Sequence, residues 1–185
     1  MTQSTPCSPR TTRFLEGERL YLKLLSEGRG ALFVTASSGA DEVACPAVIA
    51  TGGELIAAFV HPDVPAPTMP PLGSTEFPRW VACAPRFPDD RVETARVVVL
   101  VDDGSLTAAA ITSLACGLRR AGARRLVVAA PWLHPLARRA LAMITDRVVT
   151  CAQGPRPLRY DTAPHERPQR SPAAFNDAIS ETVWS

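Results

Sequence analysis

Two adjacent carboxylates, Asp102 and Asp103, are the residues of this chain best suited to chemistry. They precede a short segment of small and hydroxyl-bearing residues that ends at Thr107. Neighbouring acids can accept hydrogen bonds from a vicinal diol or hold Mg²⁺. Thr107 and the backbone N–H groups that follow it can bind an anion such as a phosphate. Together these groups predict a site for a phosphorylated sugar.

The flanking segments predict that the acids lie at the edge of a sheet. Residues 97–101 are all apolar and mostly Val, which favours a strand that is buried on both faces. From residue 108 onward the apolar positions recur at helical spacing. The acids therefore lie between a strand and a helix. Open parallel sheets bind ligands at this carboxyl end of their strands, where the following helix also presents unpaired N–H groups.

This segment resembles the signature of the type I phosphoribosyltransferases, which is an apolar strand, two acids, a short turn and a Thr/Gly-rich loop that opens a helix. The matching residues, 97–110, read Val-Val-Val-Leu-Val-Asp-Asp-Gly-Ser-Leu-Thr-Ala-Ala-Ala. The resemblance implies that Asp102 and Asp103 contact the ribose hydroxyls of phosphoribosyl diphosphate or a related ribose 5-phosphate ligand. It also implies that a loop wraps the 5′-phosphate, formed by Gly104, Ser105, Leu106, Thr107, Ala108, Ala109 and Ala110.

The resemblance extends along the chain and carries further expectations. Residues 119–131 are similar to the helix end, turn and next strand of the family, and residues 148–151 to the last strand of a bacterial subgroup. The resemblance implies displacement at the anomeric carbon, with transfer of the phosphoribosyl group to a base or other acceptor. It further implies Mg²⁺ as the cation, held at Asp102 and Asp103, and a homodimer as the assembly.

Two departures from the family pattern leave other functions open. Ala108 and Ala110 stand where the family's loop has Gly and a second Thr, so the grip on the phosphate is weaker. The nearest counterpart of the diphosphate loop, at residues 37–39, is too close to Pro46 for a crossover helix, which predicts a shortened N-terminal half. The alternatives are a catalytically inactive nucleotide sensor, regulatory subunit or assembly protein, and a rebuilt site for another phosphorylated substrate.

Trp132 and His134 follow the next predicted strand and should lie at the same sheet edge as the acids. The Trp132 ring can stack on a nucleobase, and in the resembled family the segment after this strand often contacts the base. A cap on the core or an oligomer contact is the alternative for Trp132. His134 can act as a general acid or base, or it can cap the helix that follows.

The remaining pattern predicts an α/β domain with a doubly wound, mainly parallel sheet and flanking helices, similar to the phosphoribosyltransferases. Residues 1–12 are predicted to be a mobile tail, and residues 13–185 a single domain with a Pro-rich loop around 61–90. The predicted strands are 31–35, 47–50, 55–60, 97–101, 125–129 and 147–150, with a hairpin at Gly52-Gly53 and helices at 108–121 and 135–143.

Composition excludes several classes of protein. The chain has 185 residues, of which 46% are apolar and 21% charged, as in ordinary globular domains. A net charge of +2 argues against a nucleic-acid surface, although arginines are dense around residues 119–125. The five cysteines are widely spaced, and no apolar run is long enough to span a membrane. We therefore expect a cytoplasmic protein whose local arginines solvate a helix end.

Overall fold

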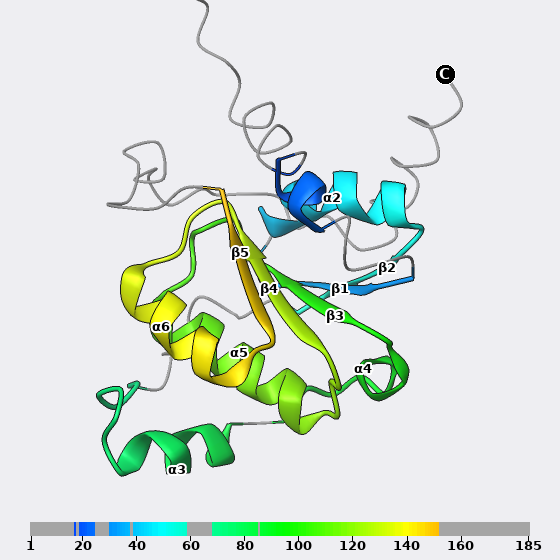
Figure 1. Cartoon of the computed structure of the whole chain (residues 1–185). Coiled ribbons are helices and arrows are strands. Elements are labelled where there is room, and N and C mark those ends of the chain that lie inside the picture. The colour runs from blue at the N-terminus through cyan, green and yellow to red at the C-terminus, as the bar shows by residue number, and fades with distance from the viewer. Residues whose placement is uncertain are drawn as a thin grey trace, which may run out of the picture.

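The structure is a computed structural model that describes residues 17, 19–24, 30–37, 39–58, 68–84 and 86–151. These residues form a sheet of five parallel strands, in the order β2-β1-β3-β4-β5, with helices packed on it (Figure 1). The predicted doubly wound α/β fold is confirmed. The predictions for the tail at 1–12 and for the segment after residue 151 lie outside the described residues.

Strands and helices largely alternate along the chain. The strands are β1 (Leu32–Thr35), β2 (Glu54–Ala57), β3 (Val98–Val101), β4 (Leu126–Ala130) and β5 (Arg147–Thr150). The helices are α2 (Ala40–Thr51), α3 (Glu76–Cys83), α4 (Arg91–Thr94), α5 (Ala108–Arg120) and α6 (Pro135–Ile144), and residues 19–24 are also helical. From residue 97 to residue 150 the predicted element boundaries are confirmed to within one residue.

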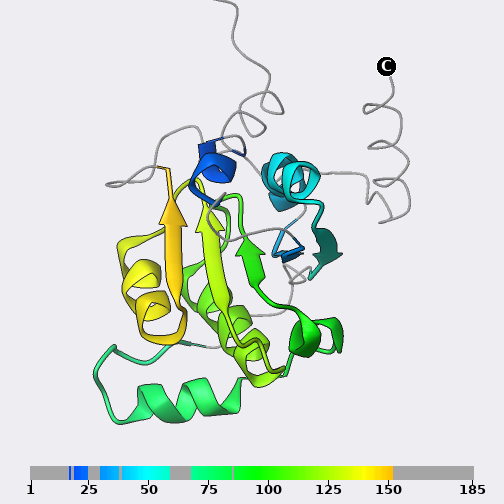
Figure 2. The ribbon, with the colours of Figure 1, turned by 45° about the vertical axis from the view of Figure 1, so that its right-hand side comes forward.

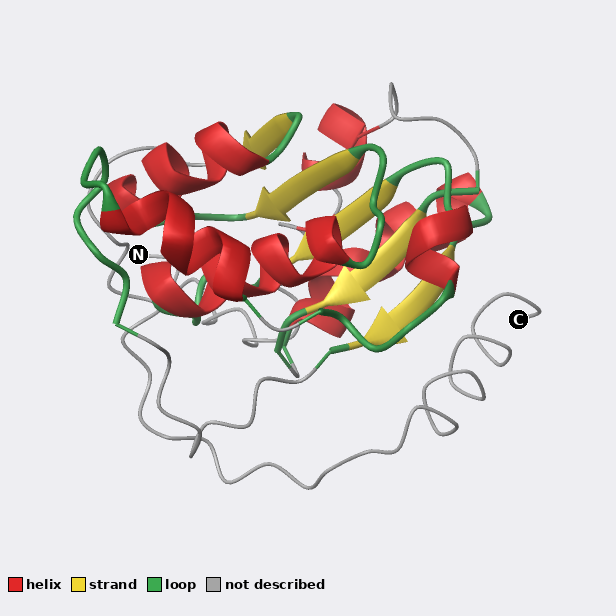
Figure 3. Ribbon diagram, turned by 90° about the horizontal axis from the view of Figure 1, so that it is seen from below, coloured by secondary structure: helices red, strands yellow, loops and turns green. Residues whose placement is uncertain are grey.

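The sheet is covered on both faces because its side chains alternate between them. Along β3, Val98 and Leu100 pack in a cluster with residues of α5 and α6, whereas Val99 and Val101 pack in a second cluster with α2 and residues 19–24. The strands run in the same direction between these two layers (Figure 3). Central strands buried on both sides explain the continuous apolar runs in the sequence.

The predicted strand at 47–50 and hairpin at Gly52-Gly53 are wrong, because these residues belong to α2 and its end. Gly52 has a left-handed φ of 60° and ends the helix by donating its N–H to Val48 O. The buried positions of α2 recur at helical spacing, at Ala40, Val43, Ala44, Ala47, Val48 and Thr51. α2 is thus a full crossover helix between parallel β1 and β2, and the prediction that this helix is missing is also wrong.

The predicted Pro-rich loop contains a helix where it is described. α3 buries Phe77, whose ring stacks on Trp80 with the centroids 6.0 Å apart. The carbonyl of Ala84 accepts a hydrogen bond from the Arg120 side chain, so the end of α3 is tied to the end of α5 (Figure 2). The loop prediction is therefore wrong for this segment. No helix among the described residues is long and apolar enough to cross a membrane.

Candidate functional site

The candidate site lies where β1 and β3 run side by side at the centre of the sheet. Thr35, the last residue of β1, is in register with Val101, the last residue of β3. The β1–α2 loop and the β3–α5 loop therefore leave the sheet at the same edge, the one to which the arrowheads point in Figure 2. α2 then covers one face and α5 the other. Such a point, where neighbouring connections diverge, is where sheets of this strand order bind ligands.

Asp102 is fully buried at the end of β3. Its Oδ2 accepts a hydrogen bond from the N–H of Gly104 at 3.0 Å. No donor among the described residues reaches Oδ1, which is also buried. Burial, reinforced by the charge of Asp103, raises the pKa of Asp102 to about 7. This carboxyl group therefore lacks one partner that a hydroxyl group or a cation of a ligand could supply.

Asp103 connects the two loops. Its Oδ1 accepts hydrogen bonds from the hydroxyl of Ser37, at 2.9 Å, and from the N–H of Ser105, at 3.2 Å. Gly104 adopts a left-handed φ of 88°, which a residue with a side chain would rarely adopt. The turn is therefore shaped by the two acids and this glycine, so the acids have a structural role in addition to any contact with a ligand.

The N-terminus of α5 is suited to an anion. Thr107 caps the helix, since its Oγ1 accepts a hydrogen bond from Ala110 N at 3.2 Å. Ala108 and Ala109 lie in the first turn, where N–H groups have no acceptor within the helix. No non-glycine residue in the described part of the chain has a positive φ, so the alanines that stand at the family's glycine and threonine positions cause no backbone strain here. The first turn also carries no acidic residue.

Of the other residues predicted for the phosphate loop, Ser105 is exposed and offers its side chain to solvent. Leu106 is partly buried and packs against the core cluster beneath α5. Leu106 therefore anchors the loop to the core, which leaves the ligand-facing groups to the backbone and to the acids.

The first turn of α2 carries two acidic residues that the sequence analysis missed, Asp41 and Glu42. Asp41, in the first turn of α2, is hydrogen-bonded by the hydroxyl of Thr35, which also lies 3.4 Å from Ile56 O. Burial raises the pKa of Asp41, and the neighbouring Glu42 adds to this rise, although the Thr35 hydrogen bond opposes it. No donor in the described part of the chain reaches Asp41 Oδ1. A correctly predicted α2 would have placed these acids at its N-terminus.

Trp132 and His134 pack against each other beyond the end of β4. The Trp132 side chain is buried, with 6% of its surface exposed, and its ring centroid lies 6.2 Å from that of His134. His134 Nδ1 accepts a hydrogen bond from Leu136 N at 3.2 Å and so caps α6. The capping alternative for His134 is confirmed. The Trp132 ring is part of the packed interior rather than an open stacking surface.

The described residues offer Mg²⁺ two neighbouring carboxylates and no larger group of ligands. No group of three or more His, Cys, Asp or Glu residues among the described ones could hold a metal ion. Asp102 and Asp103 offer two neighbouring carboxylates, and Asp102 Oδ1 lacks a partner. Mg²⁺ commonly binds through one or two carboxylates together with the phosphates of a substrate. The arrangement fits an ion that arrives with a phosphorylated ligand and then neutralises its charge.

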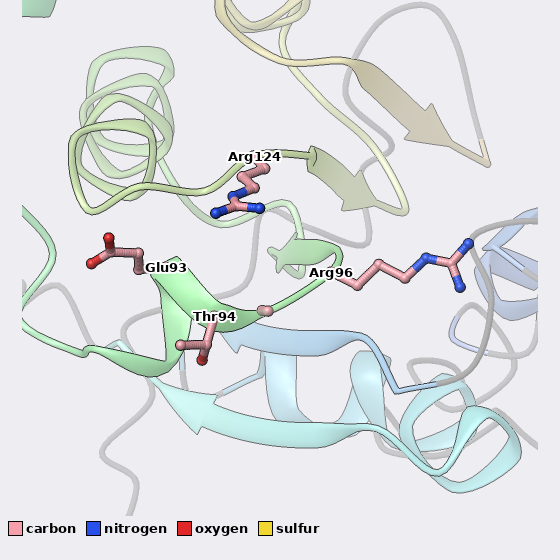
Figure 4. A pocket seen from close by; sticks show the side chains of 5 residues that line it. Glu93, Thr94, Arg96 and Arg124 are labelled. Atoms are coloured by element: carbon pink, nitrogen blue, oxygen red, sulfur yellow. The ribbon is translucent and has the colours of Figure 1, made fainter.

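A hollow of about 590 Å³ lies at the opposite edge of the sheet, next to the amino ends of β3 and β4. Arg96 and Arg124 line it, together with Glu93, but the guanidinium group of Arg96 extends away from the other two side chains (Figure 4). The charges therefore do not converge on one point. Glu93 is the acid among its lining residues, and no adjacent pair of acids like Asp102 and Asp103 lines it.

The dense arginines include one with a clear structural role. Arg119 donates hydrogen bonds to Ile144 O at 2.8 Å and to Ala123 O at 2.9 Å, and it pairs with Asp146 at 2.6 Å. These contacts tie the end of α5 to the turns before β4 and β5. Arg119 therefore has a structural role, although it joins these turns rather than solvating the helix end.

The comparisons with known proteins bear on the fold. No family model matches the chain, and no curated protein does. Among solved structures, the chain is similar to TT1426 from Thermus thermophilus, with a TM-score of 0.54 and 21% sequence identity. The match covers 79% of this chain and 86% of TT1426. At this level of identity the likeness shows a shared fold alone.

Proposed function

We propose that the edge of the sheet between the β1–α2 and β3–α5 loops binds a ribose 5-phosphate compound. The observation that carries the proposal is the pair of carboxylates at the switch point, directly before a helix N-terminus that has no acidic residue. A carboxylate pair accepts hydrogen bonds from the vicinal hydroxyls of ribose, and free backbone N–H groups bind a phosphate. Both requirements of a phosphorylated ribose are met within one loop.

The roles of the residues follow from their contacts. The N–H groups of Ala108 and Ala109 would bind the 5′-phosphate at the start of α5. Asp102 Oδ1, which has no donor from the described residues, would accept a hydrogen bond from a ribose hydroxyl. Asp103 would accept a second one while Ser37 holds it in place. The resemblance implies that the anomeric carbon would then face the β1–α2 loop.

The resemblance to the type I phosphoribosyltransferases supports transfer of a phosphoribosyl group as one activity of such a site. In that chemistry positive charge builds up on the ribose as the leaving group departs, so the protein mainly positions the reactants and excludes water. No covalent nucleophile is needed. Asp102 and Asp103 would carry negative charge near the reacting carbon, and Mg²⁺ would neutralise the charge of a phosphorylated leaving group.

A nucleotide sensor without catalysis is the second candidate. It is favoured by the first turn of α2, which carries the acids Asp41 and Glu42. The resemblance implies that a diphosphate would bind in the loop directly before this turn. Carboxylates at that position oppose an anionic leaving group. Binding without transfer needs only the phosphate site on α5 and the pair of acids on β3.

Calorimetric titration of the full-length protein with ribose 5-phosphate, with and without Mg²⁺, tests the proposal. We expect saturable binding that is at least tenfold weaker in Asp103→Asn, because asparagine keeps an oxygen for Ser37 and Ser105 but loses the charge. Asp90→Asn is the matched control, since Asp90 is exposed and lies at the N-terminus of α4. Equal binding by the wild type, Asp103→Asn and the control would reject the site, as would no binding at all.

A further inference from the structure

The two acids of the proposed site are covered in this structure. Asp102 has no exposed surface, and only 5% of the surface of Asp103 is exposed. A ribose hydroxyl must come within about 3 Å of a carboxylate oxygen to donate a hydrogen bond to it. A sugar cannot make that approach where water itself hardly reaches the carboxylates. Binding at these acids therefore requires that a part of this edge moves first.

The turn after β3 is held in place by several contacts, so it is a poor candidate for this movement. The N–H of Asp102 donates to Ala129 O at 3.0 Å, which ties the acid to β4. The N–H groups of Gly104 and Ser105 donate to the side chains of the two acids, and Leu106 packs against the core. These contacts fix the turn to the sheet and to the layer beneath α5.

The β1–α2 loop meets this turn through the side chain of Ser37. Ala36, directly after β1, is still bonded to β3, since its N–H donates to Val101 O at 2.9 Å. The Ser37 hydroxyl then donates to Asp103 Oδ1 at 2.9 Å, whereas the Ser37 carbonyl accepts a hydrogen bond from Ala40 N within the loop itself. The Ser37 hydroxyl therefore joins the loop to the turn at the point where the backbone ladder of the sheet ends.

Resting on the proposed function, we propose that the hydrogen bond between Ser37 and Asp103 is a latch that opens before a ligand reaches the two acids. When this bond breaks, the loop beyond Ala36 moves away from the turn while the sheet stays intact. The uncovered carboxylates then accept hydrogen bonds from the ribose hydroxyls, and the loop closes again with Ser37 orienting Asp103. Because only the open fraction binds, the latch slows association. Because it closes beside the bound sugar, it slows dissociation more.

Amide hydrogen exchange of the full-length protein, followed by NMR, tests the latch without a ligand. The N–H groups of Gly104 and Ser105 report the opening, since each donates to one of the two acids. In Ser37→Ala we expect both groups to exchange at least about fivefold faster than in the wild type, because local opening sets their exchange rates. Ser113→Ala is the matched control. It removes a partly buried hydroxyl from the middle of α5 and should change these rates by less than about twofold.

Stopped-flow mixing with ribose 5-phosphate, followed by tryptophan fluorescence, tests the consequence for binding. In Ser37→Ala the association rate constant should rise at least about threefold, because a larger fraction of the protein is open. The dissociation rate constant should rise by a larger factor, so that the affinity falls. Ser113→Ala should leave both rate constants unchanged.

If Ser37→Ala does not fold, Ser37→Cys takes its place, because a thiol is a weak donor to a carboxylate. Unchanged exchange at Gly104 and Ser105, or an association rate constant that the Ser37 variant does not raise, would overturn the inference and leave the site itself intact. Faster exchange without any binding of ribose 5-phosphate would instead reject the proposed function, because the loops would open as inferred with no ligand to admit.

Discussion

Ser37 and Asp103 are joined by a hydrogen bond of 2.9 Å across the two central strands, although 66 positions separate them in the sequence. Ser37 follows β1, and Asp103 follows β3. The side chain that would contact ribose is therefore held by the loop that precedes α2. Movement of either loop would change the position of the Asp103 carboxylate. The β1–α2 loop and the β3–α5 loop are therefore coupled through this hydrogen bond.

Ser37→Ala should weaken the binding of ribose 5-phosphate several-fold, because Asp103 loses the donor that orients it. Stability should fall by only about 0.5–1.5 kcal/mol, the usual net value of one hydrogen bond. Calorimetry and urea denaturation measure the two effects. Ser105→Ala is the control, since Asp103 contacts the backbone N–H of Ser105, which alanine keeps. An affinity that does not change in Ser37→Ala would show that the link does not matter for binding.

Asp102 should make the stability of the protein depend on pH. Its pKa is about 7 in the folded chain, above the ordinary value of 3.8, so the folded state binds more protons between these two values. The stability that this group contributes is fully present below the ordinary pKa and is lost as the pH rises toward the folded pKa. Each pKa unit corresponds to about 1.4 kcal/mol, so the loss across the window amounts to several kcal/mol.

Asp102→Asn should remove this dependence, because asparagine resembles the protonated acid and does not titrate. Urea denaturation at about pH 5 and about pH 8 gives the comparison. The wild type should lose about 2–3 kcal/mol more than Asp102→Asn between these conditions, since only about two pKa units of the window lie above pH 5. If the free energy of unfolding changed equally with pH in the two proteins, Asp102 would titrate near its ordinary pKa despite its burial.

The fold of the C-terminal half could be predicted because its signals are local. Buried central strands such as 97–101 give continuous apolar runs, and α5 and α6 have clear helical spacing. The N-terminal half was harder, since Ala47-Val-Ile-Ala50 has the composition of a short strand and Pro46 suggests a break. The helical spacing that begins at Ala40 is present but consists largely of alanine, which gives a weak contrast between the two faces.

The site could be predicted in part for the same reason. Asp102, Asp103 and the start of α5 lie within one strand–turn–helix segment, so their position at the edge could be inferred from the sequence. The hydrogen bond from Ser37 and the acids of α2 depend on β1 lying beside β3, which the sequence pattern does not specify. The missing donor at Asp102 Oδ1 is a property of packing and could not be predicted from residue types.

Thr107→Ala should destabilise the protein by about 0.5–2 kcal/mol, because α5 loses the side chain that caps Ala110 N. The affinity for ribose 5-phosphate should fall as well, since the first turn of the helix is no longer held in position. Thermal unfolding and calorimetry report the two effects. Thr107→Ser keeps the capping oxygen and should behave like the wild type. If Thr107→Ala were less stable but bound ribose 5-phosphate as tightly as the wild type, the cap would contribute to stability and not to phosphate binding.

Gly104→Ala should damage the turn between the two acids and α5. Gly104 has a φ of 88°, and an alanine in a left-handed conformation costs about 1–2 kcal/mol. Relief of this strain would change the position of the Gly104 N–H and so disturb Asp102 Oδ2, which accepts from it. We therefore expect a loss of stability together with weaker binding of ribose 5-phosphate. Ala108→Gly is the comparison. Residue 108 already has a helical backbone conformation, so it does not need the conformational freedom of glycine. If Gly104→Ala retained full affinity, the turn could not be what positions Asp102 toward the ligand.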